Sequence, residues 1–343
     1  MRGFALALAL GTALWLVAAG ARGGAPAAPP PLVELSGKAF GTTWEVRLLG
    51  DARAARALGT ELQGVLAAID AQMSSWRADS ELSRFNALRA ADWFPVDRDV
   101  VRVLRDAVAV HRLSGGAFDP TVAPLVDLWG FGPGPARAAP PGDAELTAAL
   151  ARVGFADLAL RDEPPALRKT RADLALDLSG VAEGFAVDAL ARRLEARGVE
   201  RFLVEVGGEL RARGEGPGGG PWRVGIERPT PGESRVEWQL GLADAALATS
   251  GDYHRYLEWG GKRLPHVIDP RTGRPVTNGL VSVSVLAGEA ARADAWATAL
   301  LVLGPEMGTA VAEREGLAVL FVRERGGWLE TTTTGAFERH LLR

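Results

Sequence analysis

The chain has 343 residues, 47% of them hydrophobic and 24% charged, which is enough to bury one large core or two. A formal net charge of −3 argues against non-specific nucleic-acid binding, so no nucleic-acid partner is expected. The absence of cysteine excludes disulfides, thiolate catalysis, iron–sulfur clusters, thiolate zinc sites and a lipid-bearing lipoprotein cysteine. The histidines, His111, His254, His266 and His340, lack the spacing of a zinc-binding pair.

The N-terminus has the pattern of an export signal. Residues 1–21 start with Met-Arg, continue with an apolar run and end in Ala-Gly-Ala, as secretory signal peptides do. The alternative is a retained anchor, because the run is only slightly shorter than the ~20 residues that span a membrane. We expect cleavage after Ala21, a Gly/Pro-rich linker over residues 22–33 and one domain over residues 34–343. The sequence therefore predicts an exported, periplasmic protein near a membrane.

The first part of the domain predicts two strands and two helices. Alternating residues on both sides of residues 41–43 predict a strand pair, and residues 53–71 have helical spacing. Residues 79–81, Asp-Ser-Glu, are typical of a helix start. Trp76 precedes that start on a polar loop, where an exposed ring could stack on a ligand ring. The alternative, and the commoner fate of a single Trp, is that it closes the edge of the core.

A second group of elements follows. Residues 99–113 predict an amphipathic helix that ends at the glycines 115–116. Asp119 precedes a proline, which places a carboxylate in a turn. That carboxylate could hold a ribose hydroxyl or an amine, or it could only cap the residues that follow. The Gly/Pro/Ala-rich residues 130–142 predict a surface loop.

Residues 173–214 predict a strand, a tight turn, a helix and a second strand, which together form a βαβ unit. Apolar residues alternate in residues 174–178, and the expected helix runs over residues 181–197 up to Gly198. The second strand is expected over residues 201–206. This stretch is the centre of the predicted domain.

The turn at residues 179–181 is a candidate phosphate site. Small residues between a strand and a helix leave backbone N–H groups pointing outward at the positive end of the helix. The carboxylates of Asp177 and Glu183 flank this turn. They would be unfavourable near an anion alone, but they fit a site that also holds a cation or sugar hydroxyls.

A formal G-x-G-x-x-G pattern over residues 214–219 is a false positive. It leads into strand-like sequence rather than a helix, so we expect a hairpin loop. Neither a Walker motif nor G-x-S-x-G is present, which argues against a Walker-type NTPase or an α/β-hydrolase.

The last third contains a candidate base and a candidate metal site. His266 lies in strand-like sequence before a turn, where it could act as a base or only satisfy a neighbouring backbone group. Asp294 and Thr298 are four residues apart in an apolar helix, so they share a face. Their oxygens suit Mg²⁺ that shares its shell with phosphates and water. Alternatively, Asp294 only favours the positive end of that helix.

Eight sequence blocks occur in the order found in a known family, and together they cover about residues 34–337. The blocks are FGTTW, MSSWRADSELSRFN, GAFDPTVAPLVDLWGFG, DLSGVAEGFAVD, LVEVGGELRARG, TSGDY, HVIDPRTGRPV and ADAWATALLVLG. On these blocks the chain resembles the ApbE family, the FAD:protein FMN transferases.

The resemblance implies a fold and an activity. The fold is α/β of the mixed α+β type, with mixed sheets flanked by helices and two intertwined subdomains around a central FAD and Mg²⁺ site. The activity moves the FMN half of FAD onto a Thr or Ser hydroxyl of an acceptor protein and releases AMP. The implied acceptor carries a D-x-x-[ST]-G-A-T motif and is a membrane-associated redox subunit.

The resemblance also implies the residues of the site. The implied FAD contacts are Phe40, Trp76, Ala117, Phe118, Asp119, Asp177, Glu183 and Ile268. The implied metal ligands are Gly180, through its carbonyl, Asp294 and Thr298. Phe40 replaces a usual Met, Trp76 a frequent Tyr and Glu183 a common Lys.

We take His266 as the catalytic base, because it lies in a ligand-rich segment and titrates near neutral pH. Two other functions remain open at this point. An FAD pyrophosphatase would use the same site with water as the acceptor, and a flavin carrier would bind without chemistry. The Asp294/Thr298 pair argues against the carrier, because retention of a flavin does not need a buried metal.

Overall fold

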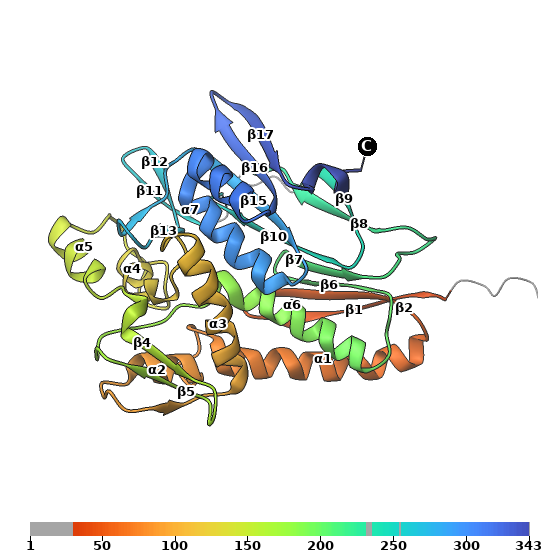
Figure 1. The fold of residues 1–343 in the computed structure, drawn as a ribbon, viewed down its shortest axis with the longest axis horizontal. Helices are drawn as coiled ribbons and strands as arrows, with labels where there is room; N and C mark the ends of the chain where they lie inside the picture. The colour runs from red at the N-terminus through yellow and green to blue at the C-terminus, as the bar shows by residue number, and fades with distance from the viewer. Residues whose placement is uncertain (1–29, 231–234, 254, 343) are drawn as a thin grey trace, which may run out of the picture.

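The computed structural model describes residues 30–230, 235–253 and 255–342 (Figure 1). The predicted signal peptide and residues 22–29 of the predicted linker lie outside the described residues.

The centre of the fold is a sheet of eight strands in the order β1-β2-β6-β7-β10-β15-β16-β17. The strands are β1 (Leu32–Ala39), β2 (Thr42–Leu49), β6 (Phe202–Val206), β7 (Glu209–Arg213), β10 (Ala245–Gly251), β15 (Leu280–Ala287), β16 (Ala318–Arg325) and β17 (Trp328–Thr334). Every pairing between the described strands is antiparallel. The α+β class is confirmed, but the expected mixed sheet is wrong, because tight turns join β1 to β2, β6 to β7 and β16 to β17 and force neighbours to run in opposite directions.

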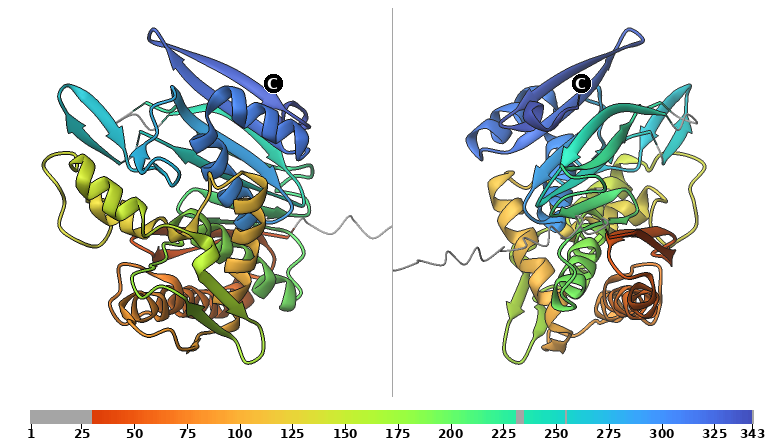
Figure 2. Two further views of the ribbon diagram at one scale, coloured as in Figure 1. Left: turned by 60° about the vertical axis from the view of Figure 1, so that its left-hand side comes forward. Right: turned by 90° about the vertical axis from the view of Figure 1, so that its right-hand side faces the viewer.

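The long helices cover one face of this sheet (Figures 1 and 2). They are α1 (Ala52–Met73), α3 (Arg98–Leu113), α6 (Ser179–Ala196) and α7 (Ala290–Arg314). The shorter helices are α2 (Glu81–Ala87), α4 (Ala123–Leu128), α5 (Asp143–Leu150) and the 3₁₀ turns η1 (Pro120–Val122), η2 (Phe155–Asp157) and η3 (Phe337–His340). Among the described helices α7 alone is long and apolar enough to span a membrane, but most of it is buried inside the fold, as expected of a core helix.

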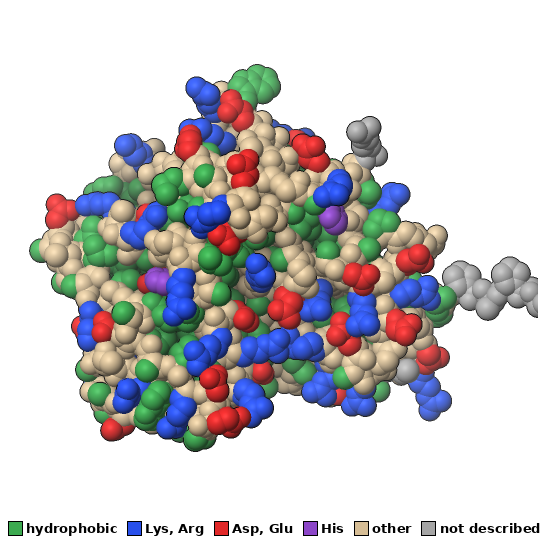
Figure 3. Space-filling view, viewed as in Figure 1, with side chains coloured by type: hydrophobic (Ala, Val, Ile, Leu, Met, Phe, Trp, Pro, Cys, Tyr) green, Lys and Arg blue, Asp and Glu red, His purple; other side chains and the backbone are tan. Residues whose placement is uncertain are grey.

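The opposite face of the sheet carries a two-stranded ribbon, β8 (Trp222–Glu227) and β9 (Val236–Leu242), over a second apolar core. Smaller sheets complete the fold. They are formed by β3 (Phe94–Pro95), β4 (Leu158–Arg161) and β5 (Ala166–Lys169), by β11 (Tyr256–Trp259) and β12 (Lys262–Pro265), and by β13 (Ile268–Asp269) and β14 (Arg274–Pro275). On the surface seen in Figure 3, acidic and basic side chains are interspersed.

Several predicted elements are confirmed. The strand pair is β1–β2, closed by Phe40 and Gly41, whose positive φ angles of 52° and 78° fit the two-residue turn that hairpins favour. The helix over residues 53–71 is α1, and α2 begins after Ser80, which accepts a hydrogen bond from the Ser83 N–H. The helix over residues 99–113 is α3. The G-x-G-x-x-G pattern leads into a strand, β8, and not into a helix, as expected, but the expected hairpin is wrong, because β7 and β8 belong to different sheets.

The predicted strand over residues 174–178 is wrong, and with it the βαβ unit. The alternation is real, because Leu174, Leu176 and Leu178 are buried, but the segment pairs with no described strand. Instead the Asn86 amide donates to the Leu176 carbonyl at 2.8 Å and accepts from the Leu176 N–H at 2.8 Å. A single side chain thus takes the place of a neighbouring strand. The helix and the second strand of the unit are present as α6 and β6.

Candidate active site

One cavity of about 410 Å³ brings the predicted site residues together. All twelve of them line it: Phe40, Trp76, Ala117, Phe118, Asp119, Asp177, Gly180, Glu183, His266, Ile268, Asp294 and Thr298. They come from the β1–β2 turn, the loops after α1 and α3, the start of α6, the segment around β13 and the first turns of α7. Segments more than 200 residues apart in the sequence therefore contribute to one site.

Aromatic side chains form part of the cavity wall. Phe40 occupies a left-handed backbone position in the β1–β2 turn, which holds this residue at the cavity. Trp76 is 59% exposed, and the guanidinium carbon of Arg255 lies 5.5 Å from the centre of its ring. A Trp this exposed does not close the core edge, so that alternative is wrong. Its ring is accessible for stacking.

The turn after α3 holds Asp119 rigidly. The Asp119 carboxylate accepts from the Thr121 N–H at 2.8 Å and from the Thr121 hydroxyl at 2.7 Å. The His111 ring places Nδ1 2.9 Å from the Phe118 carbonyl and 3.5 Å from the other Asp119 oxygen. Asp119 therefore caps the following turn and also lines the cavity, so the two sequence interpretations are compatible.

The start of α6 differs from the expected phosphate site. Asp177 accepts hydrogen bonds from the backbone N–H and the hydroxyl of Ser179, and the Val181 N–H donates to the Leu178 carbonyl at 3.0 Å. These N–H groups are already used within the turn. The N–H groups of Ser179 and Val181 are therefore not the outward-pointing donors that the sequence predicted, because the Asp177 side chain and the Leu178 carbonyl accept them within the turn.

Three acidic side chains meet behind this turn. Asp294 and Glu209 are 5% and 6% exposed, and Glu183 is half-buried. Burial raises the pKa of Asp294 well above its usual range, and the Glu183 charge adds to the effect. Burial is also the main cause of the raised pKa of Glu209, and the negative charges of Asp294 and Glu183 raise it further. Burial also raises the pKa of Glu183, and a hydrogen bond with Glu209 opposes that rise.

The residues present fit a hard cation. Within the described residues no group of three or more His, Cys, Asp or Glu side chains forms a metal site, so a cation here would also need hydroxyl, backbone or substrate oxygens. The Thr298 hydroxyl lies 3.1 Å from the Ser250 hydroxyl, and a Cβ on Gly180 would come 3.1 Å from the Thr298 oxygen. One oxygen of Glu209 is buried without a hydrogen-bond partner in the described structure. A cation beside Asp294 would offset the buried negative charge.

His266 lines the same cavity and is half-buried. Its Nδ1 lies 3.1 Å from the Arg255 carbonyl, and its backbone N–H donates to the same carbonyl at 3.0 Å. A carbonyl only accepts, so Nδ1 carries the hydrogen and Nε2 is the basic nitrogen of the neutral ring. The ring also packs edge-on against Phe131 at 6.3 Å.

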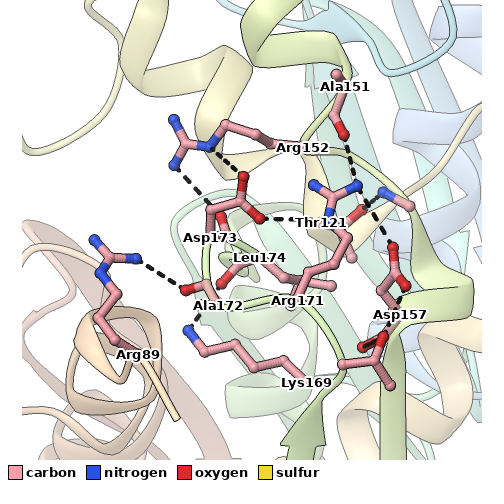
Figure 4. Close-up of polar contacts among 12 residues, drawn as sticks. Arg89, Thr121, Ala151, Arg152, Asp157, Lys169, Arg171, Ala172, Asp173 and Leu174 are labelled. Atoms are coloured by element: carbon pink, nitrogen blue, oxygen red, sulfur yellow. Dashed lines mark hydrogen bonds and ion pairs between the residues drawn. The ribbon is translucent and has the colours of Figure 1, made fainter. Parts of the chain in front are cut away.

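A polar network outside the cavity fixes the segment that leads to Asp177 (Figure 4). The ammonium of Lys169, which is fully buried, donates to the Phe85, Asn86 and Leu174 carbonyls at 3.0, 3.2 and 3.0 Å. These acceptors match the three N–H donors of the ammonium. The Asp177 N–H then donates to the Pro120 carbonyl at 2.7 Å, which ties the segment to the Asp119 turn.

Sequence reasoning missed several residues of the cavity, namely Glu209, Thr249, Ser250 and Arg255. Three of them, Glu209, Thr249 and Ser250, lay in blocks that the resemblance already used, LVEVGGELRARG and TSGDY. Glu209 lies on the same face of β7 as Arg211, whose guanidinium donates to the buried Asp188 at 2.6 Å, a contact that the strand pattern alone does not indicate. That face points to the helices and not to solvent.

Comparison with known proteins defines the class. The sequence matches the ApbE family over residues 40–321. The FAD:protein FMN transferase of Salmonella typhimurium is 42% identical over 318 residues, which cover 92% of this chain and 91% of the relative. The flavin transferase ApbE of Vibrio cholerae has the same fold, with a TM-score of 0.83 at 38% identity, covering 91% of this chain and 100% of that structure.

The apo form of the flavinyl transferase ApbE of Pseudomonas stutzeri also has a TM-score of 0.83 at 38% identity, covering 92% of this chain and 98% of that structure. The fold is thus the one shared by these flavin transferases. The chain belongs to the ApbE family.

Proposed function

We propose that this protein is an FAD:protein FMN transferase, which moves the FMN half of FAD onto a Thr or Ser hydroxyl of an acceptor protein and releases AMP. One observation carries the proposal: the residues that the family resemblance assigns to FAD, metal and base line a single cavity. The relatives named above, similar over about nine tenths of this chain, support the same activity.

We assign FAD binding to the predicted residues that line the cavity. These residues form groups according to the chemical type of their side chains. Phe40 and Trp76 offer apolar and stacking surface for the flavin ring. Asp119 and Asp177 offer carboxylate oxygens for hydroxyl or amine groups. Ala117, Phe118, Glu183 and Ile268 complete the FAD-contacting set.

Asp294, Thr298 and the carbonyl of Gly180 would hold Mg²⁺, the divalent cation that suits a shell of protein, phosphate and water oxygens. When bound there, Mg²⁺ would offset the negative charge of the FAD pyrophosphate. The chain itself orients the Asp294 carboxylate on α7, because the Gly184 N–H donates a hydrogen bond to it at 3.2 Å.

The transfer forms one O–P bond and breaks another. The acceptor hydroxyl oxygen attacks the phosphorus on the FMN side, and the bond from that phosphorus to the AMP phosphate breaks. His266 takes the hydroxyl proton at Nε2, because Nδ1–H is held by the Arg255 carbonyl. A half-buried His in a cavity wall is well placed for this role.

The proposal extends to the setting of the reaction. We propose a periplasmic location near the membrane, which the signal-like residues 1–21 and the linker support, without a lipidated cysteine. The acceptor is a membrane-associated redox subunit that carries a D-x-x-[ST]-G-A-T segment. The hydroxyl nucleophile therefore comes from outside this chain.

The test is intact-mass analysis of an acceptor peptide carrying D-x-x-T-G-A-T, incubated with the full chain, FAD and Mg²⁺. We expect a mass gain of one FMN, lost with EDTA and with Asp294→Asn. Asp143→Asn is the matched control, since its side chain is 93% exposed and does not line the cavity. Free FMN and AMP without a modified peptide would instead indicate a pyrophosphatase, and intact bound FAD a carrier.

The role of His266 has its own test. We expect His266→Ala to lower turnover at saturating FAD by about 10²–10⁴-fold, the usual contribution of a general base. His340→Ala is the control, because His340 lies in η3, outside the cavity. Unchanged turnover in His266→Ala would remove it from the mechanism.

A further inference from the structure

A second cavity of about 410 Å³ adjoins the first on the other side of the sheet end. The two share Gly207 and Thr249, which line both. The floor of the second cavity is apolar, and its members are Leu203, Leu210, Val224, Ile226 and Leu247. The active-site residues proposed above do not account for this space.

The edge of β8 forms one wall of this second cavity, which we call the groove. The five consecutive residues 223–227 of β8 line it, opposite β2 and β6 of the main sheet. Among the described strands, β8 pairs only with β9, so its other edge is open. No backbone hydrogen bond from another described segment reaches residues 223–226. The ribbon β8–β9 therefore has an open strand edge on the side that faces this cavity, beside residues of β2 and β6.

The groove has the dimensions of an extended peptide. Along β6 it runs from Gly207 to Leu203, about 13 Å at the rise of a strand. One end opens at Thr249, which also lines the active-site cavity. A chain lying along β8 would thus come beside the residues that the two cavities share, Gly207 and Thr249.

We propose that an extended segment of the acceptor protein binds in this groove as an added strand on β8 and delivers its hydroxyl residue past Gly207 and Thr249 to the active site. This inference rests on the proposed transferase function. Backbone pairing to an open sheet edge supplies affinity for segments of varied sequence, and alternate side chains enter pockets that set specificity. One enzyme could then modify several acceptors.

Among the charged groups that the structure describes in the groove, one cation is available for an acidic residue of the bound segment. These charged groups are Glu45, Arg47, Glu205, Arg223 and Glu227. Arg47 is engaged by Glu34 and Glu45, whereas Arg223 is exposed and forms no ion pair within the part of the chain that the structure describes. The Asp of the proposed acceptor motif would find its partner at Arg223.

Hydrogen exchange of the full-length protein tests the added strand. The probe is the D-x-x-T-G-A-T peptide with its reacting threonine replaced by alanine. With the peptide at ten times its dissociation constant, we expect exchange of the edge-facing amides in residues 223–226 to slow about tenfold. The control is β17, the open edge strand at the end of the main sheet, whose exchange should not change.

Cross-linking gives a second, independent measurement. Because the chain has no cysteine, Arg223→Cys introduces a unique thiol. Peptides with a bromoacetyl group at either terminus should alkylate this thiol, with loss of bromide, and give one covalent adduct. Trp328→Cys is the control, because Trp328 is 78% exposed on β17, away from the groove.

FMN transfer to the reactive peptide is measured in parallel. Transfer together with β8 protection and an Arg223→Cys adduct supports the inference. Transfer with unprotected β8 and no adduct above the control overturns the docking site and leaves the proposed function standing. Absence of transfer overturns the proposed function, and the docking site with it.

Discussion

Gly184 is the point where α6 and α7 cross, and Gly184→Ala tests how closely their contact sets the active site. A Cβ at this position would lie 2.5 Å from the Ala290 carbonyl oxygen and 2.8 Å from the Ala291 Cα. Both are backbone atoms at the start of α7, so no side chain can rotate away. The helices must separate, and Asp294 on α7 would move with them.

The expected magnitude follows from two opposing effects. Replacing glycine by alanine within a helix stabilises by about 1 kcal/mol, whereas forcing a methyl group into a packed interface costs about 1–3 kcal/mol. Since the obstacle here is backbone, we expect the upper part of that range and a net loss of about 1–2 kcal/mol in the free energy of unfolding. The Gly184 N–H bond to Asp294, 3.2 Å long, should lengthen as the helices part.

Gly64→Ala is the matched control. Gly64 lies within α1, and a Cβ there would meet no atom within 4 Å. The same chemical change should therefore stabilise by about 0.5–1 kcal/mol. Urea unfolding measures both variants as shifts in midpoint at constant slope. FMN transfer by Gly184→Ala should fall and need more Mg²⁺, whereas Gly64→Ala should match the wild type.

A stabilised Gly184→Ala protein with wild-type Mg²⁺ dependence would refute the reasoning. It would mean that α7 shifts at no cost and that the position of Asp294 does not depend on the crossing.

Two further predictions concern buried charges. Asp188 accepts from the first two N–H groups of α7 and pairs with Arg211, so Asp188→Ala should lower the free energy of unfolding by about 3–5 kcal/mol in urea titrations; a loss below 1 kcal/mol would contradict this. Burial lowers the pKa of Lys169 from 10.5 to about 8. Between these pH values the unfolded chain binds a proton that the folded chain does not, so stability rises by about 3 kcal/mol from pH 8 to 10.5. Lys169→Met should lack this rise in the free energy of unfolding. Equal pH profiles of the unfolding free energy in the two proteins would contradict the assignment of the rise to Lys169.

The sequence predicted the elements whose determinants are local. The spacing in α1 and α3, the Ser80 cap and the β1–β2 turn each depend on residues within one element, and all are confirmed. The grouping of the site residues came from the order of the family blocks, since no local pattern links Phe40 to Thr298. The assigned role of each residue in that group is still a prediction.

What the sequence could not supply depended on distant partners. Alternation in residues 174–178 correctly indicated which side chains are buried, but burial does not say whether the backbone pairs with a strand. Asn86, 90 residues earlier in the chain, takes that role. The N–H groups of Ser179 and Val181 differ from the prediction for a local reason, because the Asp177 side chain and the Leu178 carbonyl accept them within the turn.

Glu209 shows why a buried acid is more informative in a structure than in a sequence. In a strand pattern a glutamate indicates a solvent-facing position, and that interpretation fails here because the face is covered by helices. Burial of Glu209 beside Asp294 and Glu183 opposes folding, and one Glu209 oxygen has no partner in the described structure. A fold keeps such a cluster at a cost in stability, which is typical of sites where a positive ligand binds. The unfavourable burial of these acidic side chains therefore supports a cation site beside Asp294, near the start of α7.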